Sequence, residues 1–154
     1  MVTIRTIENV KLGAKITLIN GIYAVLLGVF YMLFRELIVV TNFRSAEAIW
    51  QLFAKYNPEV SGLFIKSIVL HGIFIVAFGI GIVYLSQQIL KKKEKSTWIA
   101  LFLVGLIFWA SSLTIEALNK NVYTMSASLI GWLSFVIGML IPIKYYTQKN
   151  YDYV

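Results

Sequence analysis

The chain has 154 residues, of which 59% are hydrophobic and only 14% are charged, and its formal net charge is +7. Soluble domains contain about 45 to 50% apolar residues, so this composition indicates a membrane protein. The sequence has no cysteine, which excludes disulfides, thiolate metal sites and C-x-x-C redox centres. The basic residues lie beside apolar runs, as the positive-inside rule and anionic head groups favour, so we expect membrane lipids as partners and no nucleic acid.

Four apolar segments predict an all-α protein, an integral membrane four-helix transmembrane bundle that forms a single domain. We expect its helices at about residues 14–34, 62–86, 97–118 and 122–143. Each covers the roughly 30 Å of a bilayer core at about 1.5 Å of rise per residue. Ser86, Gln87 and Gln88 are expected to close the second span, and Pro142 helps to end the fourth. A tight turn is expected at residues 119–121.

The two ends of the chain are polar. Ile4, Ile7 and Val10 are spaced by three, which fits either a short amphipathic helix on the membrane surface or a frayed terminus. No A-x-A cleavage pattern closes the first apolar run, so we expect an uncleaved first helix. We expect the tail from residue 144 to 154 to be exposed, with its four tyrosines, Tyr145, Tyr146, Tyr151 and Tyr153.

Between the first two spans lies a connection of about 26 residues, which is long for a structureless loop. Arg35 and Glu36 are expected to end the first span. Ser45 can cap a helix at about residues 46–56, which Asn57 and Pro58 would stop. One side of this helix is apolar, with Ile49, Trp50, Leu52, Phe53 and Tyr56. The pattern predicts either an extracytoplasmic interfacial helix or a helix docked on the bundle.

The distribution of Lys and Arg predicts the orientation. One face of the expected bundle has Arg5, Lys11, Lys15, Lys91, Lys92, Lys93, Lys95, Lys144 and Lys149, whereas the other has Arg35, Arg44, Lys55, Lys66 and Lys120. This bias favours a multi-pass protein of the cell membrane with both termini in the cytoplasm.

Small residues recur seven positions apart in every span, which is two helical turns and therefore one stripe. In a bilayer such residues let helix backbones approach and gain van der Waals contact. We therefore expect helix-packing seams at Gly21, Gly28, Gly72, Gly79, Gly105, Ser112, Gly131 and Gly138.

The polar residues within the spans are the candidate site. His71, the only histidine, is close to the middle of the second span, with Ser67 one turn away. A buried histidine can either bond between helices or take part in proton transfer or ligand binding. Trp109 and Trp132 reach a similar depth, and Asn20 is expected to form a hydrogen bond between helices.

Glu116 lies near the end of the third span, on one stripe with Gly105, Trp109 and Ser112. Lys66 is at matching depth in the second span. It can pair with Glu116, or its long stem can take the ammonium to the membrane surface.

Nothing in the sequence identifies a reaction. A bis-histidine haem needs a second histidine, and the only aspartate, Asp152, is in the tail. Phosphate-loop and G-x-S-x-G patterns are missing. We therefore lean against an enzyme, and we expect no cofactor, no metal and no catalytic residue.

Two functions remain in view. The first is a non-catalytic accessory or structural subunit of a larger membrane complex. The alternative is a small oligomeric transporter or channel for protons or a small solute, in which His71, Glu116 and Asn20 line the path. We expect either other membrane subunits or further copies of the chain as protein partners. Convergence of these three residues on one cavity would favour the transporter.

Overall fold

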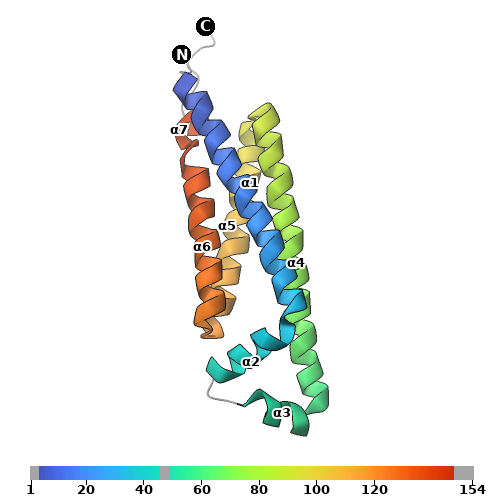
Figure 1. Ribbon diagram of the computed structural model, residues 1–154. Helices are drawn as coiled ribbons and strands as arrows, with labels where there is room; N and C mark the ends of the chain where they lie inside the picture. Colours follow the sequence, from blue (N-terminus) through green and yellow to red (C-terminus); the bar gives the residue numbers. More distant parts are fainter. Residues whose placement is uncertain (1–3, 46–48, 148–154) are drawn as a thin grey trace.

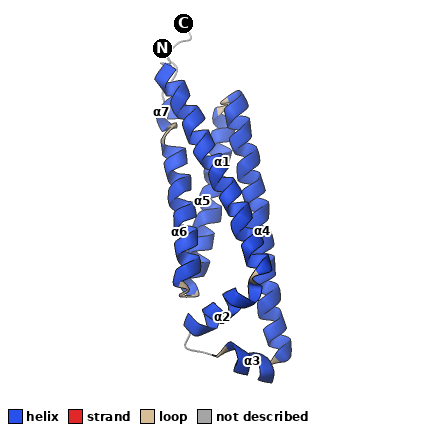
Figure 2. Cartoon of the chain, viewed as in Figure 1, coloured by secondary structure: helices blue, strands red, loops and turns tan. Residues whose placement is uncertain are grey.

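The computed structural model describes residues 4–45 and 49–147, and in this part of the chain it contains seven α-helices and no strand (Figures 1 and 2). Four of the helices are long: α1 (Ile4–Leu33), α4 (Pro58–Lys92), α5 (Lys95–Leu118) and α6 (Val122–Leu140). All four are long and apolar enough to cross a membrane, the shortest having 19 residues. The prediction of an all-α protein with four helices of spanning length is therefore confirmed.

The four long helices alternate in direction and pack as a bundle (Figure 1). The most extensive contact is between α1 and α4, and α6 packs against both α1 and α5. We call the end of the bundle that holds the 119–121 turn the loop end. The opposite end, where both chain termini lie, is called the terminal end.

The first helix begins ten residues earlier than predicted, at Ile4 instead of residue 14. Residues 4–15 therefore belong to the same helix as the first span and do not form a separate surface helix. Val10 and Ala14 are buried in the core. Gly13 packs so closely that an added Cβ would lie 2.6 Å from the carbonyl oxygen of Gly138. These contacts with α6 explain why the polar lead stays helical.

The second span was predicted too short at both ends, since α4 covers 35 residues and not 62–86. Pro58 occupies its first turn, where the missing N–H costs nothing. Ser86, predicted to close the span, is buried and donates to Thr17 Oγ1 at 2.9 Å. The helix ends at Lys92, followed by Lys93 in the left-handed conformation with φ of 55°.

The connection from α1 to α4 folds as two helices, α2 (Arg35–Ser45) and α3 (Trp50–Tyr56). Arg35 and Glu36 thus begin a helix that the sequence analysis missed. Ser45 is the last residue of α2 and not the cap of α3, which Ile49 precedes. Residues 46–48 of the predicted helix lie outside the described residues. Helix α2 is stabilised by burial of two of its apolar side chains, Ile38 and Val39, against the bundle.

The apolar side of α3 is divided between two environments. Trp50 and Phe53 pack against Phe43 of α2, with ring centroids 4.9 and 5.0 Å apart, and Phe64 of α4 completes this aromatic cluster. The other apolar side chains, Ile49, Leu52 and Tyr56, are exposed. Of this apolar side, only Trp50 and Phe53 are therefore docked in the aromatic cluster. A location of α3 at the membrane surface stays a prediction.

The predicted turn at residues 119–121 is confirmed. Lys120 has φ of 53°, and the Asn121 side chain caps α6 by accepting from the backbone N–H of Tyr123 at 3.1 Å and of Thr124 at 3.4 Å. Because α6 ends at Leu140, two residues before Pro142, the fourth span is three residues shorter than predicted.

The start of the tail is not exposed as predicted. It forms the short helix α7 (Ile143–Thr147), in which Tyr146 is buried and stacks on Trp98 with ring centroids 5.0 Å apart. Burial, with a smaller contribution from Tyr145, raises the pKa of Tyr146 to about 12, so this phenol stays protonated at neutral pH. Tyr151 and Tyr153 lie outside the described residues.

Candidate functional site

The glycines of α1 and α4 bring two backbones into direct contact. An added Cβ would lie 2.6 Å from the carbonyl oxygen of Gly72 if placed on Gly28, and 2.9 Å from that of Gly21 if placed on Gly79. Such contacts leave no room for a side chain, which is the packing that small residues permit between helices in a bilayer. The α1–α4 contact therefore fixes how these two helices are placed relative to each other.

The small residues of α5 and α6 serve a different purpose. Gly105 faces the ring of Phe135, and Gly131 faces the ring of Trp109, where an added Cβ would lie 2.0 Å from Trp109 Cη2. Gly138 packs against α1, and Ser112 shares a hydrogen bond of 3.1 Å with Ser128. On these helices two of the four small residues, Gly105 and Gly131, make room for large rings.

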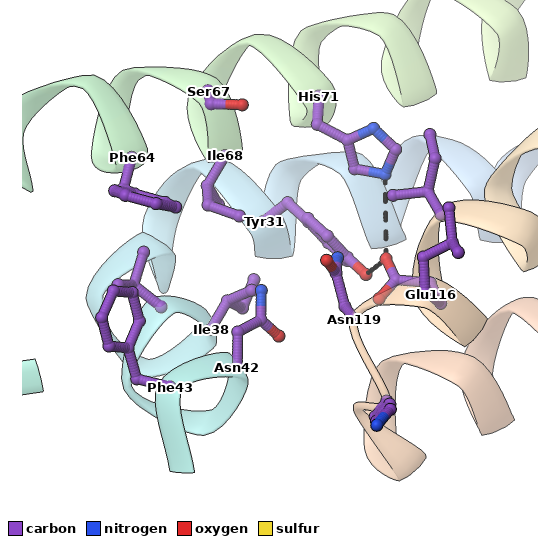
Figure 3. Close-up of a pocket in the computed structure, with 14 residues that line it drawn as sticks. Tyr31, Ile38, Asn42, Phe43, Phe64, Ser67, Ile68, His71, Glu116 and Asn119 are labelled. Atoms are coloured by element: carbon purple, nitrogen blue, oxygen red, sulfur yellow. Dashed lines mark hydrogen bonds and ion pairs between the residues drawn. The ribbon is translucent and has the colours of Figure 1, made fainter. Parts of the chain in front are cut away.

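At the loop end, all four long helices contribute one side chain to a buried polar group, the Glu116 cluster. Glu116 of α5 is 2% exposed and accepts hydrogen bonds from the Tyr31 hydroxyl of α1 and the Thr124 hydroxyl of α6. His71 of α4 lies beside them, with Nε2 3.8 Å from Glu116 Oε1 (Figure 3). The cluster thus consists of Glu116, Tyr31, Thr124 and His71.

The α1–α4 contact places two members of this cluster. Gly28 of α1 touches Gly72 of α4. Gly28 lies one turn before Tyr31, and Gly72 directly follows His71. As a result the Tyr31 and His71 rings have centroids 5.3 Å apart. The Asn121 cap starts α6 three residues before Thr124. The positions of the cluster are therefore set by helix packing and capping.

The chemistry of the cluster follows from its donors and acceptors. The two hydroxyls donate to both Glu116 oxygens, an arrangement that suits a carboxylate. The separation of 3.8 Å between His71 and Glu116 exceeds a hydrogen bond, and His71 Nε2 is buried without a hydrogen-bond partner among the described residues. His71 is therefore the described basic side chain that lies next to the Glu116 carboxyl group, without a hydrogen bond between them.

Three members of the cluster, Tyr31, His71 and Glu116, line a cavity of about 750 Å³ at the loop end. Besides Tyr31, His71 and Glu116, the cavity is lined by side chains of α2, α4, the end of α5 and the 119–121 turn: Ile38, Val39, Asn42, Phe43, Phe64, Ser67, Ile68, Ile115, Leu118, Asn119 and Lys120. Figure 3 shows the His71, Tyr31 and Glu116 side chains converging at one end of this lining. The cavity therefore combines apolar walls with a buried carboxylate.

Helix α2 closes one side of the cavity and is fixed by Asn121. The Asn121 amide donates to Thr41 Oγ1 at 2.9 Å and to Asn42 Oδ1 at 2.7 Å, while its oxygen caps α6. One side chain thus joins the 119–121 turn to the helix that covers the cavity.

A second buried polar group, the Asn20 cluster, lies deeper in the bundle. The Asn20 amide donates to Gly131 O at 2.7 Å and to Ser134 Oγ at 2.8 Å, and its oxygen accepts from Trp109 Nε1 at 3.0 Å. Asn20 does not line the cavity, so the structure brings together His71 and Glu116 but not Asn20, and the predicted convergence of all three residues on one cavity is not found. Trp132 is partly buried against the core and is also outside the cavity lining.

Lys66 and Ser67 occupy the exposed side of α4. Among the residues that the structure describes, no ion pair joins Lys66 to Glu116, whose partners are His71, Tyr31 and Thr124. Ser67 lines the cavity without bonding to His71 in any described contact.

Sequence reasoning missed Tyr31, Thr124 and the α2 side chains of the cavity. A signal for the first two was present: Gly21, Ala24, Gly28 and Tyr31 follow spacings of three and four, and Thr124 shares such a stripe with Ser128, Gly131 and Phe135. For α2, the apolar run from Leu37 to Val40 was not recognised as helical.

Within residues 4–45 and 49–147, no group of three or more His, Asp or Glu side chains is arranged to hold a metal ion. The chain matches no protein-family model, no curated protein and no solved structure.

Proposed function

We propose that this chain is a multi-pass protein of the cell membrane with both termini in the cytoplasm. The length and apolar surface of α1, α4, α5 and α6 support insertion, since their exposed side chains include many Leu, Ile and Phe. The excess of Lys and Arg at the terminal end supports the orientation. In this arrangement the cavity opens on the extracytoplasmic side.

Within this membrane, we propose a small transporter that moves protons through the bundle, alone or in exchange for a solute. The proposal rests on one observation: a buried carboxylate, Glu116, lies 3.8 Å from a histidine with an unpaired nitrogen, in the wall of a cavity. Ionisable side chains are costly inside a membrane and mark ion and proton routes when they face a cavity. An imidazole can both accept and donate a proton.

Buried polar side chains continue from the cavity toward the terminal end and support a route for the proton. Ser112 and Ser128 bond to each other one turn along α5 and α6 from the cavity. The Asn20 cluster follows, and beyond it Ser86 bonds to Thr17. Along α1 and α5 successive polar positions are three or four residues apart, or about 4.5 to 6 Å of rise.

Proton flux in liposomes tests this proposal. Purified protein is reconstituted with a pH-sensitive dye inside the vesicles, and a potassium gradient with valinomycin sets the membrane potential. We expect wild-type vesicles to change internal pH at least about tenfold faster than protein-free vesicles, and Glu116→Gln and His71→Ala to remove most of that difference.

The matched control is Lys66→Gln, which removes a charge at similar depth on the exposed side of α4. Its flux should equal that of the wild type. Flux at the protein-free rate in wild-type vesicles, or flux that survives both Glu116→Gln and His71→Ala, would contradict the proposal. Circular dichroism and gel filtration of each variant separate loss of function from loss of fold.

The accessory-subunit function remains a second candidate because of α3. Leu52 and Tyr56 of α3, and Ile49 directly before it, are exposed outside the four long helices, a surface that lipid or another subunit can cover. Purification at native expression level separates the candidates. A stable hetero-complex would favour the subunit, whereas a monodisperse particle made only of this chain would favour the transporter.

A further inference from the structure

The cavity differs from the rest of the bundle interior in holding a buried acid whose described partners include no permanently charged base. Glu116 is 2% exposed, and its hydrogen-bond donors, Tyr31 and Thr124, are neutral hydroxyls. The one basic side chain within 4 Å is His71, which is charged only when protonated. A carboxylate removed from water needs a counter-charge, so the unprotonated pair leaves a site that attracts a cation.

The walls determine what kind of cation fits. Phe43 and Phe64 have ring centroids 5.4 Å apart in an edge-to-face contact, and both line the cavity with Tyr31. These rings give the cavity an apolar surface that suits apolar substituents, and Ile68 and Ile115 add aliphatic surface. A hydrated metal ion gains little from such walls, whereas an organic cation with apolar substituents gains from all of them.

The size and position of the cavity agree with this chemistry. A volume of about 750 Å³ is within the roughly 300 to 1,000 Å³ of small-molecule sites. Its lining includes Ile115 and Leu118, which are exposed on α5 where a bilayer would lie, so an apolar molecule can reach the cavity from lipid. Lys120 in the 119–121 turn also lines the cavity and repels a bound cation from one side.

We infer that the loop-end cavity binds amphiphilic organic cations, with the charge near Glu116 and the apolar substituents against Phe43, Phe64 and Ile115. The inference rests on the proposed function, since it names the solute class that exchanges with the proton of the His71–Glu116 pair. A bound organic cation balances the negative charge of Glu116, as the proton of the His71–Glu116 pair otherwise does. The cation and the proton therefore occupy the cavity alternately.

The test uses tetraphenylphosphonium and tetraphenylborate, which have nearly the same shape and apolar surface but opposite charge. Equilibrium binding of each is measured on the purified full-length protein in maltoside micelles. We expect saturable binding of the cation and at least about tenfold weaker binding of the anion. Glu116→Gln should weaken cation binding at least about tenfold, and Phe64→Ala about threefold or more.

Two further variants guard against misfolding. Lys120→Gln, at an exposed turn, should tighten cation binding about twofold or more because it removes the repelling charge. Ser126→Ala should change nothing, because Ser126 is exposed on α6 and bonds only to its own helix at Val122 O among the described contacts. The inference would be overturned if the anion bound as tightly as the cation. It would also be overturned if neither single variant, Glu116→Gln or Lys120→Gln, changed the affinity for the cation.

The outcome is separable from that of the proposed function. Cation binding without proton flux would keep this inference and remove the transporter. Proton flux that depends on Glu116, without cation binding, would keep the transporter and remove this inference.

Discussion

The two buried polar clusters of the bundle solve the same problem in different ways. In the Asn20 cluster the side-chain amide donates to Gly131 O and Ser134 Oγ and accepts from Trp109 Nε1, all on other helices, and Asn20 does not line the loop-end cavity. In the Glu116 cluster, His71 Nε2 is unpaired and a cavity of about 750 Å³ adjoins it. Polar groups that are fully satisfied hold helices together, whereas a polar group left partly unsatisfied beside a cavity can bind something else.

The largest expected effect tests whether the α1–α4 contact sets up the Glu116 cluster. Gly28→Ala places a Cβ 2.6 Å from the backbone oxygen of Gly72, which cannot rotate away. We expect a loss of about 3 kcal/mol in the free energy of unfolding, measured in bicelles by steric trapping, together with loss of cation binding. The matched control is Gly81→Ala, where an added Cβ meets nothing within 4 Å. A gain of about 0.5 kcal/mol is expected there, and equal effects at both positions would argue against the close contact.

The next effect tests the structural role of the Asn20 cluster. Asn20→Ala removes three hydrogen bonds and leaves Trp109 Nε1 buried without a partner. At about 0.6 kcal/mol for each bond between membrane helices, we expect a loss of about 2 kcal/mol in unfolding free energy. Tetraphenylphosphonium affinity should stay within about twofold of the wild type. A selective loss of affinity without loss of stability would assign this cluster to the binding site.

A smaller loss of stability is expected at the Glu116 cluster, with the opposite effect on function. In Glu116→Gln the amide can still bond to the hydroxyls of Tyr31 and Thr124. We therefore expect a loss of only about 1 kcal/mol in the free energy of unfolding. Cation binding and proton flux should nevertheless fall about tenfold. If Glu116→Gln lost more unfolding free energy than Asn20→Ala and still bound the cation, the Glu116 cluster would be structural and would not be the binding site.

The smallest effect is expected between the clusters. Ser112→Ala removes one hydrogen bond of 3.1 Å to Ser128 and leaves a hydroxyl that can bond back to its own helix. We expect a loss of about 0.6 kcal/mol in unfolding free energy. Proton flux should fall if this pair lies on the proton route. Unchanged flux would exclude the pair from the route without affecting the role of Glu116.

Much of the fold could be predicted from local sequence. The four long helices follow from the length of their apolar runs, and the turn at residues 119–121 follows from polar residues between two such runs. The break at Asn57 and Pro58 was also predicted, because proline ends one helix and can begin the next. The errors lie at the ends: α1 and α4 extend into polar sequence where Val10 and Ser86 find partners on other helices.

The amino-acid sequence by itself determined which segments are helical and apolar and which polar side chains lie within them, because hydrophobic length and turn residues act locally. It placed His71 and Glu116 in the spans, and for Lys66 it allowed either pairing with the acid or extension to the membrane surface. Only the tertiary structure decided that Glu116 instead meets His71, Tyr31 and Thr124, and that α2 covers a cavity beside them. These pairings depend on the rotation of each helix about its axis and on the distance between backbones. The glycine contacts of α1 and α4 fix these quantities, and a single span does not encode them.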